Sequence, residues 1–196
     1  MKKGFRVVLA SGSPRRREIL DRSGIAHEVM VSSCSEETDE TEPAAYVKEL
    51  ALRKALDVKN RAGADALVLA ADTVVALDDE ILGKPADETD AENMLKSLSG
   101  RFHEVYSGVA ILFPNGEKEV FSNCTRVYVR PLTKEQIKEY IDTKEPMDKA
   151  GAYGIQGGFG LYIERIDGDY LNVVGLPVSE LYARALARGY DLRHQK

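Results

Sequence analysis

A run of hydroxyl, glycine and arginine residues stands near the start of the chain, from Ser11 to Arg17 (SGSPRRR). Its proline suits the first turn of a helix, because proline's fixed φ is helical and no N–H is needed there. Cations are unfavourable at that end of a helix, where the backbone dipole is positive. An anion would relieve this, since free N–H groups and the planar forks of Arg15 and Arg16 bind phosphate oxygens. We therefore expect Ser11, Arg15 and Arg16 to hold a polyphosphate, and Arg17 to lie at the surface.

Asp72 interrupts the most apolar stretch of the chain, Ala66 to Leu77. A lone carboxylate in a buried strand is costly unless it is paired with a cation or holds a metal ion. A strand-like pattern continues at Thr73, which argues against a turn at this position. Asp72 is therefore predicted to be a site residue, either a magnesium ligand or a general base.

Three lysines and two glutamates are further candidates. Lys54 interrupts an apolar helical stretch, Lys84 lies between a glycine and a proline, and Lys149 lies in the stretch PMDKAG. Each could neutralise phosphate charge, although a solvated surface lysine is the commoner case. Glu36 and Glu37 lie in an acidic loop and could bind a metal ion, but a solvent-facing loop explains them equally well.

The segment from Ala150 to Gly160 (AGAYGIQGGFG) is dense in glycine, which indicates an irregular loop and close backbone approach. Gln156 is its one amide side chain, and an amide can both donate to and accept from the edge of a nucleobase. Tyr153 or Phe159 could stack on a ring. The alternative is a flexible connector with a tyrosine in the core.

Apolar periodicity and turn signals predict the elements that position these residues. Helices are expected from Pro14 to about Gly24 and from Pro43 to about Arg61. Two more are expected behind capping boxes at Thr89–Glu92 and Thr133–Gln136, and a last one spans Pro177 to Gly189. Strands are expected at Phe5–Ala10, His27–Ser32, Ala66–Leu77, Glu80–Leu82, Tyr106–Phe113, Glu119–Val129, Leu161–Arg165 and Tyr170–Val174. Because hairpins dominate the second half, an α/β or α+β fold with a mixed sheet is favoured over a purely parallel one.

Composition limits the class of protein. The chain has 196 residues, 43% hydrophobic and 30% charged, which fits one domain or two small lobes sharing a core. A net charge of −5 argues against a nucleic-acid polymer as partner. Cys34 and Cys124 form no metal-spacing motif, so we expect reduced thiols and a cytoplasmic protein. The apolar run near the N-terminus is too short for a signal peptide or a membrane span.

These motifs together resemble the Maf family of nucleoside triphosphate pyrophosphatases, also called septum formation inhibitor Maf proteins. The resemblance lies in LASGSPRRREIL, ADTVV, GKP, LSGR, EPMDKAGAYGIQG and GDYxxVxGLP, which occur in this order along nearly the whole chain. It implies a single elongated α/β domain over residues 1–196, similar to the inosine triphosphatase type, in which a mixed, twisted sheet with flanking helices forms two lobes around a cleft. It also implies that a nucleoside triphosphate is cleaved to the monophosphate and pyrophosphate.

The resemblance also implies roles for individual residues. Asp72 would activate water, directly or as a metal ligand beside Glu36, although Glu37 could take that place. The metal would be divalent, with magnesium expected first and manganese or cobalt as alternatives. Ser11, Arg15, Arg16, Lys54 and Lys84 would hold the phosphates.

The stretches SPRR, ADT and YGIQG are similar to the dTTP/UTP branch of the family and not to the 7-methyl-GTP branch. In that branch Arg15, Thr73 and Gln156 are tied to the choice of base. Canonical and modified pyrimidine triphosphates both remain open as substrates. Two rival functions remain, a non-catalytic nucleotide-binding regulator of cell division and a purine triphosphatase of the inosine type. The family is compatible with a homodimer.

Overall fold

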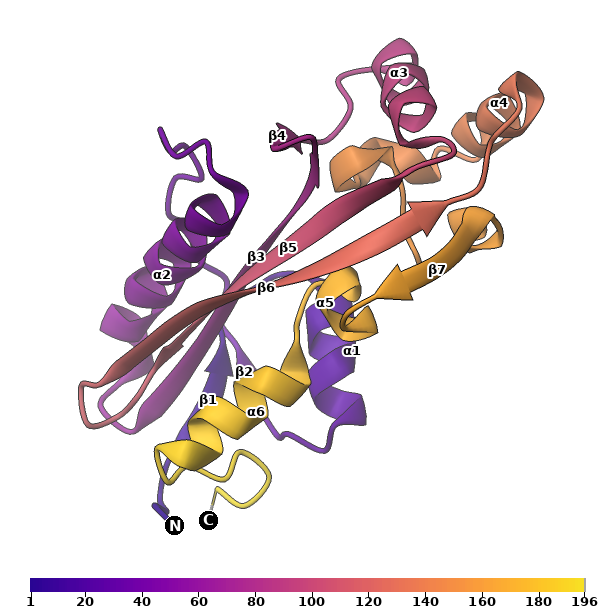
Figure 1. The fold of residues 1–196 in the computed structure, drawn as a ribbon. Coiled ribbons are helices and arrows are strands. Elements are labelled where there is room, and N and C mark those ends of the chain that lie inside the picture. Colours follow the sequence, from indigo (N-terminus) through magenta and orange to yellow (C-terminus); the bar gives the residue numbers. More distant parts are fainter. Residues whose placement is uncertain (196) are drawn as a thin grey trace.

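The centre of the fold is a seven-stranded sheet with the strand order β2-β1-β3-β5-β6-β7, and β4 pairs with β3 outside this path (Figure 1). The structure is a computed structural model that describes residues 1–195, so the last residue of the expected 1–196 domain lies outside the description. Strand β1 (Arg6–Leu9) pairs in parallel with β2 (Glu28–Val29) on one side and with β3 (Ala66–Leu77) on the other. Only two residues of the expected strand at His27–Ser32 are therefore paired.

The rest of the sheet is antiparallel. Strand β3 pairs with β5 (Phe102–Leu112), β5 with β6 (Lys118–Val129), and β6 with β7 (Ile163–Asp167). Asp78 and Asp79 both have positive φ and turn β3 into β4 (Glu80–Leu82), as a two-residue hairpin loop requires. Two parallel pairings beside an antiparallel set confirm the predicted mixed α/β sheet.

Helices cover both faces of the sheet (Figure 1). Helix α2 (Pro43–Ala62) packs on one face, and α1 (Pro14–Arg22) and α6 (Val178–Ala187) pack on the other. Helices α3 (Glu88–Leu98) and α4 (Lys134–Asp142) lie at the far end, with the short helices η1 (Glu145–Asp148), η2 (Ala150–Ala152) and η3 (Gly158–Tyr162). None of the helices in residues 1–195 combines the length and the apolar character needed to cross a membrane.

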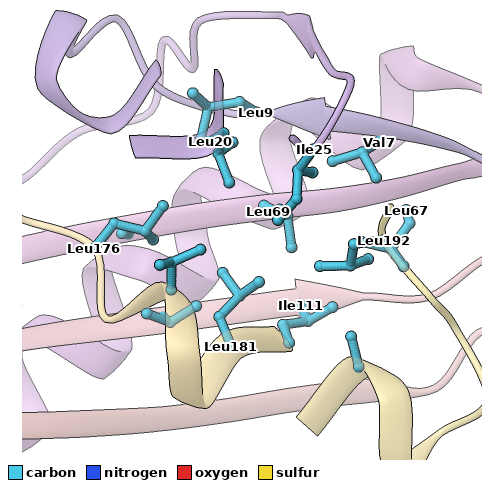
Figure 2. Close-up of a cluster of buried hydrophobic side chains, with 14 of the residues drawn as sticks. Val7, Leu9, Leu20, Ile25, Leu67, Leu69, Ile111, Leu176, Leu181 and Leu192 are labelled. Carbon is cyan, nitrogen blue, oxygen red and sulfur yellow. The ribbon is translucent and has the colours of Figure 1, made fainter. Parts of the chain in front are cut away.

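Strand β3 explains where the sheet opens. Leu67, Leu69 and Ala71 face the cluster formed with α1 and α6, part of which Figure 2 shows, while the alternate residues face α2. Further along, Val75 belongs to a separate cluster with α3 and α4. Positions 72 and 73 fall between these clusters and are only half-buried, although both neighbouring stretches of the strand are buried. The packing therefore leaves polar side chains accessible at the middle of an otherwise apolar strand.

Gly108 lets α2 approach the sheet closely. It pairs with Asp72 across β5 and β3, and a Cβ atom built on it would lie 2.2 Å from the carbonyl oxygen of Val47 in α2. No side chain fits in that space, because real Cβ contacts are essentially never shorter than 3.0 Å. The glycine thus allows the short distance between α2 and the sheet, and α2 carries Lys54.

Two sequence expectations about local structure are wrong. Tyr170–Val174 forms helix α5 and not a strand, because the Asp169 side chain accepts a hydrogen bond from Leu171 N at 2.8 Å and caps the helix. The buried Asn172 then bonds back to the sheet, where its Nδ2 donates to Val105 O at 2.9 Å. Helix α3 is capped by the side chain of Asp87 and not by Thr89. The capping box of Thr133 and Gln136 is present as predicted.

Candidate active site

A cavity of about 450 Å³ opens beside the half-buried positions of β3. Its walls come from the start of α1, the middle of β3 and β5, the loop after β4, residues 145–157 and the end of α5. It is bordered by seven of the sequence candidates, Arg15, Arg16, Thr73, Lys84, Lys149, Tyr153 and Gln156. Ser11 reaches this wall through its hydrogen bond to Arg16, and Asp72 is the chain neighbour of Thr73, whereas Glu36, Glu37, Lys54 and Phe159 do not border the cavity.

Arg16 joins three separate parts of the chain at the cavity wall. Its Nε donates to the carbonyl oxygen of Gly175 at 2.9 Å, Nη1 to Ser11 Oγ at 3.1 Å, and Nη2 to Thr73 Oγ1 at 3.2 Å. Burial lowers the pKa of its guanidinium, Arg15 acts in the same direction, and Asp72 and Glu36 oppose it. Arginine keeps its charge under such a perturbation, so the site retains a fixed cation. Arg17 is exposed, as expected.

A chain of hydroxyl groups behind Arg16 was not predicted from the sequence. Thr73 Oγ1 lies 2.7 Å from Ser107 Oγ, and Ser107 Oγ donates to the carbonyl oxygen of Asn172 at 2.9 Å. Because that bond uses the one hydroxyl proton of Ser107, Thr73 donates to Ser107 while accepting from Arg16. The chain therefore fixes the hydroxyl of Thr73 and the fork of Arg16 relative to each other. Ser107 lies in an ordinary strand pattern, which carries no signal for this role.

Asp72 points to the α2 side of the sheet, where it is paired. Lys54 Nζ lies 2.6 Å from Asp72 Oδ1 and 2.7 Å from Glu36 Oε1. The side chains of Asp72 and Lys54 are 13% and 12% exposed, whereas that of Glu36 is 67% exposed. Burial alone would lower the pKa of Lys54, but its two carboxylate partners raise it overall. The hydrogen bond from Lys54 lowers the pKa of Glu36, with further help from the charges of Lys84 and Arg16.

The choice between the two loop glutamates is decided by geometry. Glu36 reaches Lys54, whereas the part of Glu37 that bonds to the helix is its backbone carbonyl, which accepts from Arg53 Nη1 at 2.5 Å. The side chain of Glu37 is exposed. Glu36 is therefore the acidic-loop carboxylate that adjoins Asp72.

Two lysines and the glycine-rich loop also border the cavity. Lys84 is exposed at the cavity, and the carbonyl oxygen of Gly83 accepts a hydrogen bond from Gly151 N at 2.9 Å. Lys149 pairs with Asp148. Two lysines with flexible stems thus border the same cavity as Arg15 and Arg16, an arrangement suited to a polyanion.

Glu145 organises the loop that carries Gln156. Its Oε1 accepts from Tyr140 Oη at 2.9 Å and its Oε2 accepts from Gly158 N at 3.0 Å. A Cβ atom on Gly157 would lie 1.8 Å from Glu145 Oε1. The glycine density did indicate close approach, but the group approached here is a carboxylate of the protein. Glu145 begins the stretch EPMDKAGAYGIQG, but the sequence predicted no role for it.

The aromatic candidates of this loop differ from one another. Phe159 is 0% exposed within the cluster of α3 and α4, so the expectation that it could stack on a base is wrong. Tyr153 borders the cavity with only 5% of its surface exposed, and its hydroxyl lies 2.7 Å from His103 Nε2. Gln156 is exposed at the cavity.

The donor set fits a divalent ion shared with a substrate. Asp72 and Glu36 bring carboxylate oxygens to one cation, the ammonium of Lys54. Magnesium in phosphate sites is commonly held by one or two carboxylates together with substrate phosphates and water. Within residues 1–195 there is no group of three or more His, Cys, Asp or Glu side chains that could hold a metal alone. This pattern suits an ion that arrives with a phosphate ligand.

Comparison with known proteins relates the chain to one family. Residues 6–187 match the family model described as Maf-like protein. The chain is 46% identical over 195 residues to a dTTP/UTP pyrophosphatase of Lachnoclostridium phytofermentans, a match that covers 97% of this chain and 99% of that protein. It is 51% identical over 181 residues to a dTTP/UTP pyrophosphatase of Clostridium novyi, covering 91% and 95%.

Among solved structures, a nucleoside-triphosphatase / dITP/XTP pyrophosphatase of Mycobacterium abscessus matches with a TM-score of 0.45 and 18% identity, covering 71% of this chain and 95% of that one. This similarity is too distant to inform the chemistry of the site. The family model and the two relatives span almost the whole chain, and on that basis the chain belongs to the Maf family.

Proposed function

We propose that this protein is a nucleoside triphosphate pyrophosphatase that hydrolyses dTTP and UTP to the monophosphate and pyrophosphate. The observation that supports this chemistry is the pair of adjacent residues on β3. Asp72 is paired with Lys54, and the next residue, Thr73, accepts a hydrogen bond from Arg16 at the cavity. The pyrimidine substrates are inferred from relatives that are 46% and 51% identical and bear the name dTTP/UTP pyrophosphatase.

The cations of the cavity are suited to the triphosphate. Arg16 is held rigidly by its three acceptors and presents a fixed charge, while Lys84 and Lys149 can adjust to the phosphate oxygens. Ser11 and the start of α1 add hydroxyl and backbone donors. Negative charge grows on the pyrophosphate as it leaves, so preorganised cations that meet it there lower the barrier.

Asp72 is assigned the activation of the attacking water. In the proposed reaction a water oxygen bonds to the α-phosphorus, its proton passes to the Asp72 carboxylate, and the bond to the oxygen bridging the α- and β-phosphates breaks. Lys54 holds the Asp72 carboxylate through Oδ1 at 2.6 Å and so orients it. Glu36 and Asp72 would hold the divalent metal, with magnesium expected first and manganese or cobalt as alternatives. The metal, when bound, would polarise the phosphate and lower the pKa of bound water.

Base choice is assigned to the other end of the cavity. Gln156 can donate to and accept from the edge of a pyrimidine, while Arg15 and Thr73 shape the neighbouring wall. Canonical and modified pyrimidine triphosphates are both included in this proposal. A cytoplasmic location and a homodimer remain predictions of the sequence.

The decisive experiment is pyrophosphate release from a panel of triphosphates with varied metals. Asp72→Asn should reduce turnover of dTTP and UTP by at least about 100-fold, which is the lower range for loss of a general base. Its circular dichroism spectrum should match that of the wild type, and Asp79→Asn at the hairpin serves as a carboxylate control. Near-normal turnover by Asp72→Asn would remove Asp72 from the mechanism.

The same panel separates the rival functions. If nucleotide binds but no triphosphate is cleaved with any metal, the protein is a non-catalytic regulator. A preference for inosine or xanthosine triphosphate would instead favour the purine enzyme. Release of orthophosphate in place of pyrophosphate would show that a different bond is cleaved.

A further inference from the structure

His103 lies in β5 behind the wall of the cavity and takes no part in the proposed reaction. It is 1% exposed, and its Nε2 lies 2.7 Å from Tyr153 Oη. The two rings meet edge to face with centroids 5.1 Å apart and an interplanar angle of 76°. Its Nδ1 is buried and has no hydrogen-bond partner within residues 1–195. A buried nitrogen without a hydrogen bond is costly, so an apolar side chain would avoid the cost of Nδ1. What histidine adds at this position is the hydrogen bond between Nε2 and Tyr153.

The bond joins two neutral groups. Burial lowers the pKa of His103 to about 4, and burial also raises the pKa of Tyr153 well above its ordinary value. Neither partner therefore changes charge near neutral pH. The pair has no charge to offer a phosphate, and its distance from solvent makes a direct role in proton transfer from water unsuitable.

Tyr153 is the first residue of the loop that carries Gln156. The next residue, Gly154, donates its N–H to Tyr140 Oη at 3.2 Å, and Glu145 holds Gly158 at the exit of the loop. The loop is thus held at both ends by buried or half-buried side chains, while Gln156 between them is exposed at the cavity. Loss of the hydrogen bond between His103 and Tyr153 would shift the start of the loop. The hydrogen bond from Gly158 N to Glu145 would still hold its end.

We infer that His103 is a positioning residue for base recognition, because through the Tyr153 hydroxyl it sets the loop that presents Gln156 to the pyrimidine. The inference rests on the proposed function. It assigns the selectivity of the cavity partly to a side chain that never touches the substrate. The phosphate end of the site is anchored separately by Arg16, so the two ends should respond differently to a change at His103.

Three variants test this. His103→Phe keeps a ring of similar shape and removes the hydrogen bond from one side, and Tyr153→Phe removes it from the other. His103→Gln is the conservative variant, since its amide can reach the position of Nε2 and bond to the hydroxyl. Calorimetry then measures the dissociation constants of UMP, CMP and pyrophosphate for each protein. UMP and CMP differ at the base edge that an amide side chain can distinguish.

The wild type should bind UMP more tightly than CMP. His103→Phe and Tyr153→Phe should each reduce that ratio about fivefold, the equivalent of one hydrogen bond, and leave pyrophosphate binding within about twofold. His103→Gln should restore most of the ratio. The double variant His103→Phe/Tyr153→Phe should lose no more than either single variant, because both remove one bond.

An unchanged ratio in both Phe variants would overturn the inference, as would a parallel weakening of all three ligands, which a merely structural role predicts. Equal affinity of the wild type for UMP and CMP would overturn it too. Turnover of UTP by the wild type is measured beside these and reports on the proposed function alone. If the wild type releases pyrophosphate but the His103 variants leave the ratio of UMP to CMP affinity unchanged, the positioning role is rejected and the proposed enzymatic function stands.

Discussion

Acidification should destabilise this protein through His103. The folded state lowers the pKa of this histidine from 6.5 to about 4 because burial disfavours the imidazolium. Between these values the unfolded chain binds a proton that the folded chain does not bind. The free energy of unfolding therefore falls as the pH drops through the unfolded pKa, and the loss levels off below the folded one. Tyr153, the bonded partner, has a raised pKa and does not titrate in this window.

The size of the effect follows from the shift. One pKa unit corresponds to about 1.4 kcal/mol, so the full difference amounts to about 3 kcal/mol, of which about 2 kcal/mol is lost by pH 5. That is a large share of the stability of an ordinary domain, which is roughly 5 to 15 kcal/mol. His103 is 1% exposed, so solvent screening does not reduce the estimate appreciably.

Urea unfolding followed by circular dichroism at several pH values measures this directly. His103→Gln is the matched control, because it keeps a hydrogen-bonding side chain but cannot titrate. The difference in unfolding free energy between wild type and variant should shrink by about 2 kcal/mol between pH 7 and pH 5. Carboxylates and the other two histidines contribute equally to both proteins and cancel. A difference that stays constant over this range would refute the argument that His103 is neutral and buried.

Three further predictions concern packing and the site. Gly108→Ala should destabilise the fold by about 1 to 3 kcal/mol or more in urea unfolding, since its methyl group would collide with the backbone of α2. Arg16→Lys should lower kcat/KM for UTP about tenfold or more, because lysine cannot keep three directed hydrogen bonds, whereas Arg17→Lys should leave kcat/KM unchanged. Glu36→Gln should raise the magnesium concentration for half-maximal activity about tenfold, and an equal effect of Glu37→Gln would contradict the assignment.

Local signals predicted most elements well where they were strong and short in range. The apolar stretch of β3 has the predicted bounds, Ala66–Leu77, and α2 begins at Pro43 as expected. The exception is α5. Its residues, Tyr170–Val174, follow the turn signal Asp167-Gly168 and therefore resemble the second strand of a hairpin. There Asp169 caps the helix, and the side chain of Asn172 bonds it to β5 and β6, which are distant in sequence, so that no local pattern reports these bonds.

The candidate site shows the same division. Residues that are chemically unusual for their surroundings can be recognised from the sequence. Examples are arginines at a helix start, a carboxylate in an apolar strand and an amide among glycines. Supporting residues such as Ser107, and Glu145 at the start of EPMDKAGAYGIQG, carry no chemical signal of their own in the sequence, and their importance lies in which groups they contact. Glu36 and Glu37 are equivalent neighbours in the sequence, and the contact with Lys54 distinguishes them.

By itself, then, the sequence determined the mixed sheet and the family, and it singled out the start of α1 and Asp72 as candidate site features. These depend on residue type and on spacing within one element. Only the tertiary structure decided which glutamate meets Asp72, how Arg16 is anchored, and that His103 stands behind the Gln156 loop. Each of these is a contact between residues far apart in the sequence, and the first two form where separate hydrophobic clusters at either end of β3 leave its middle open.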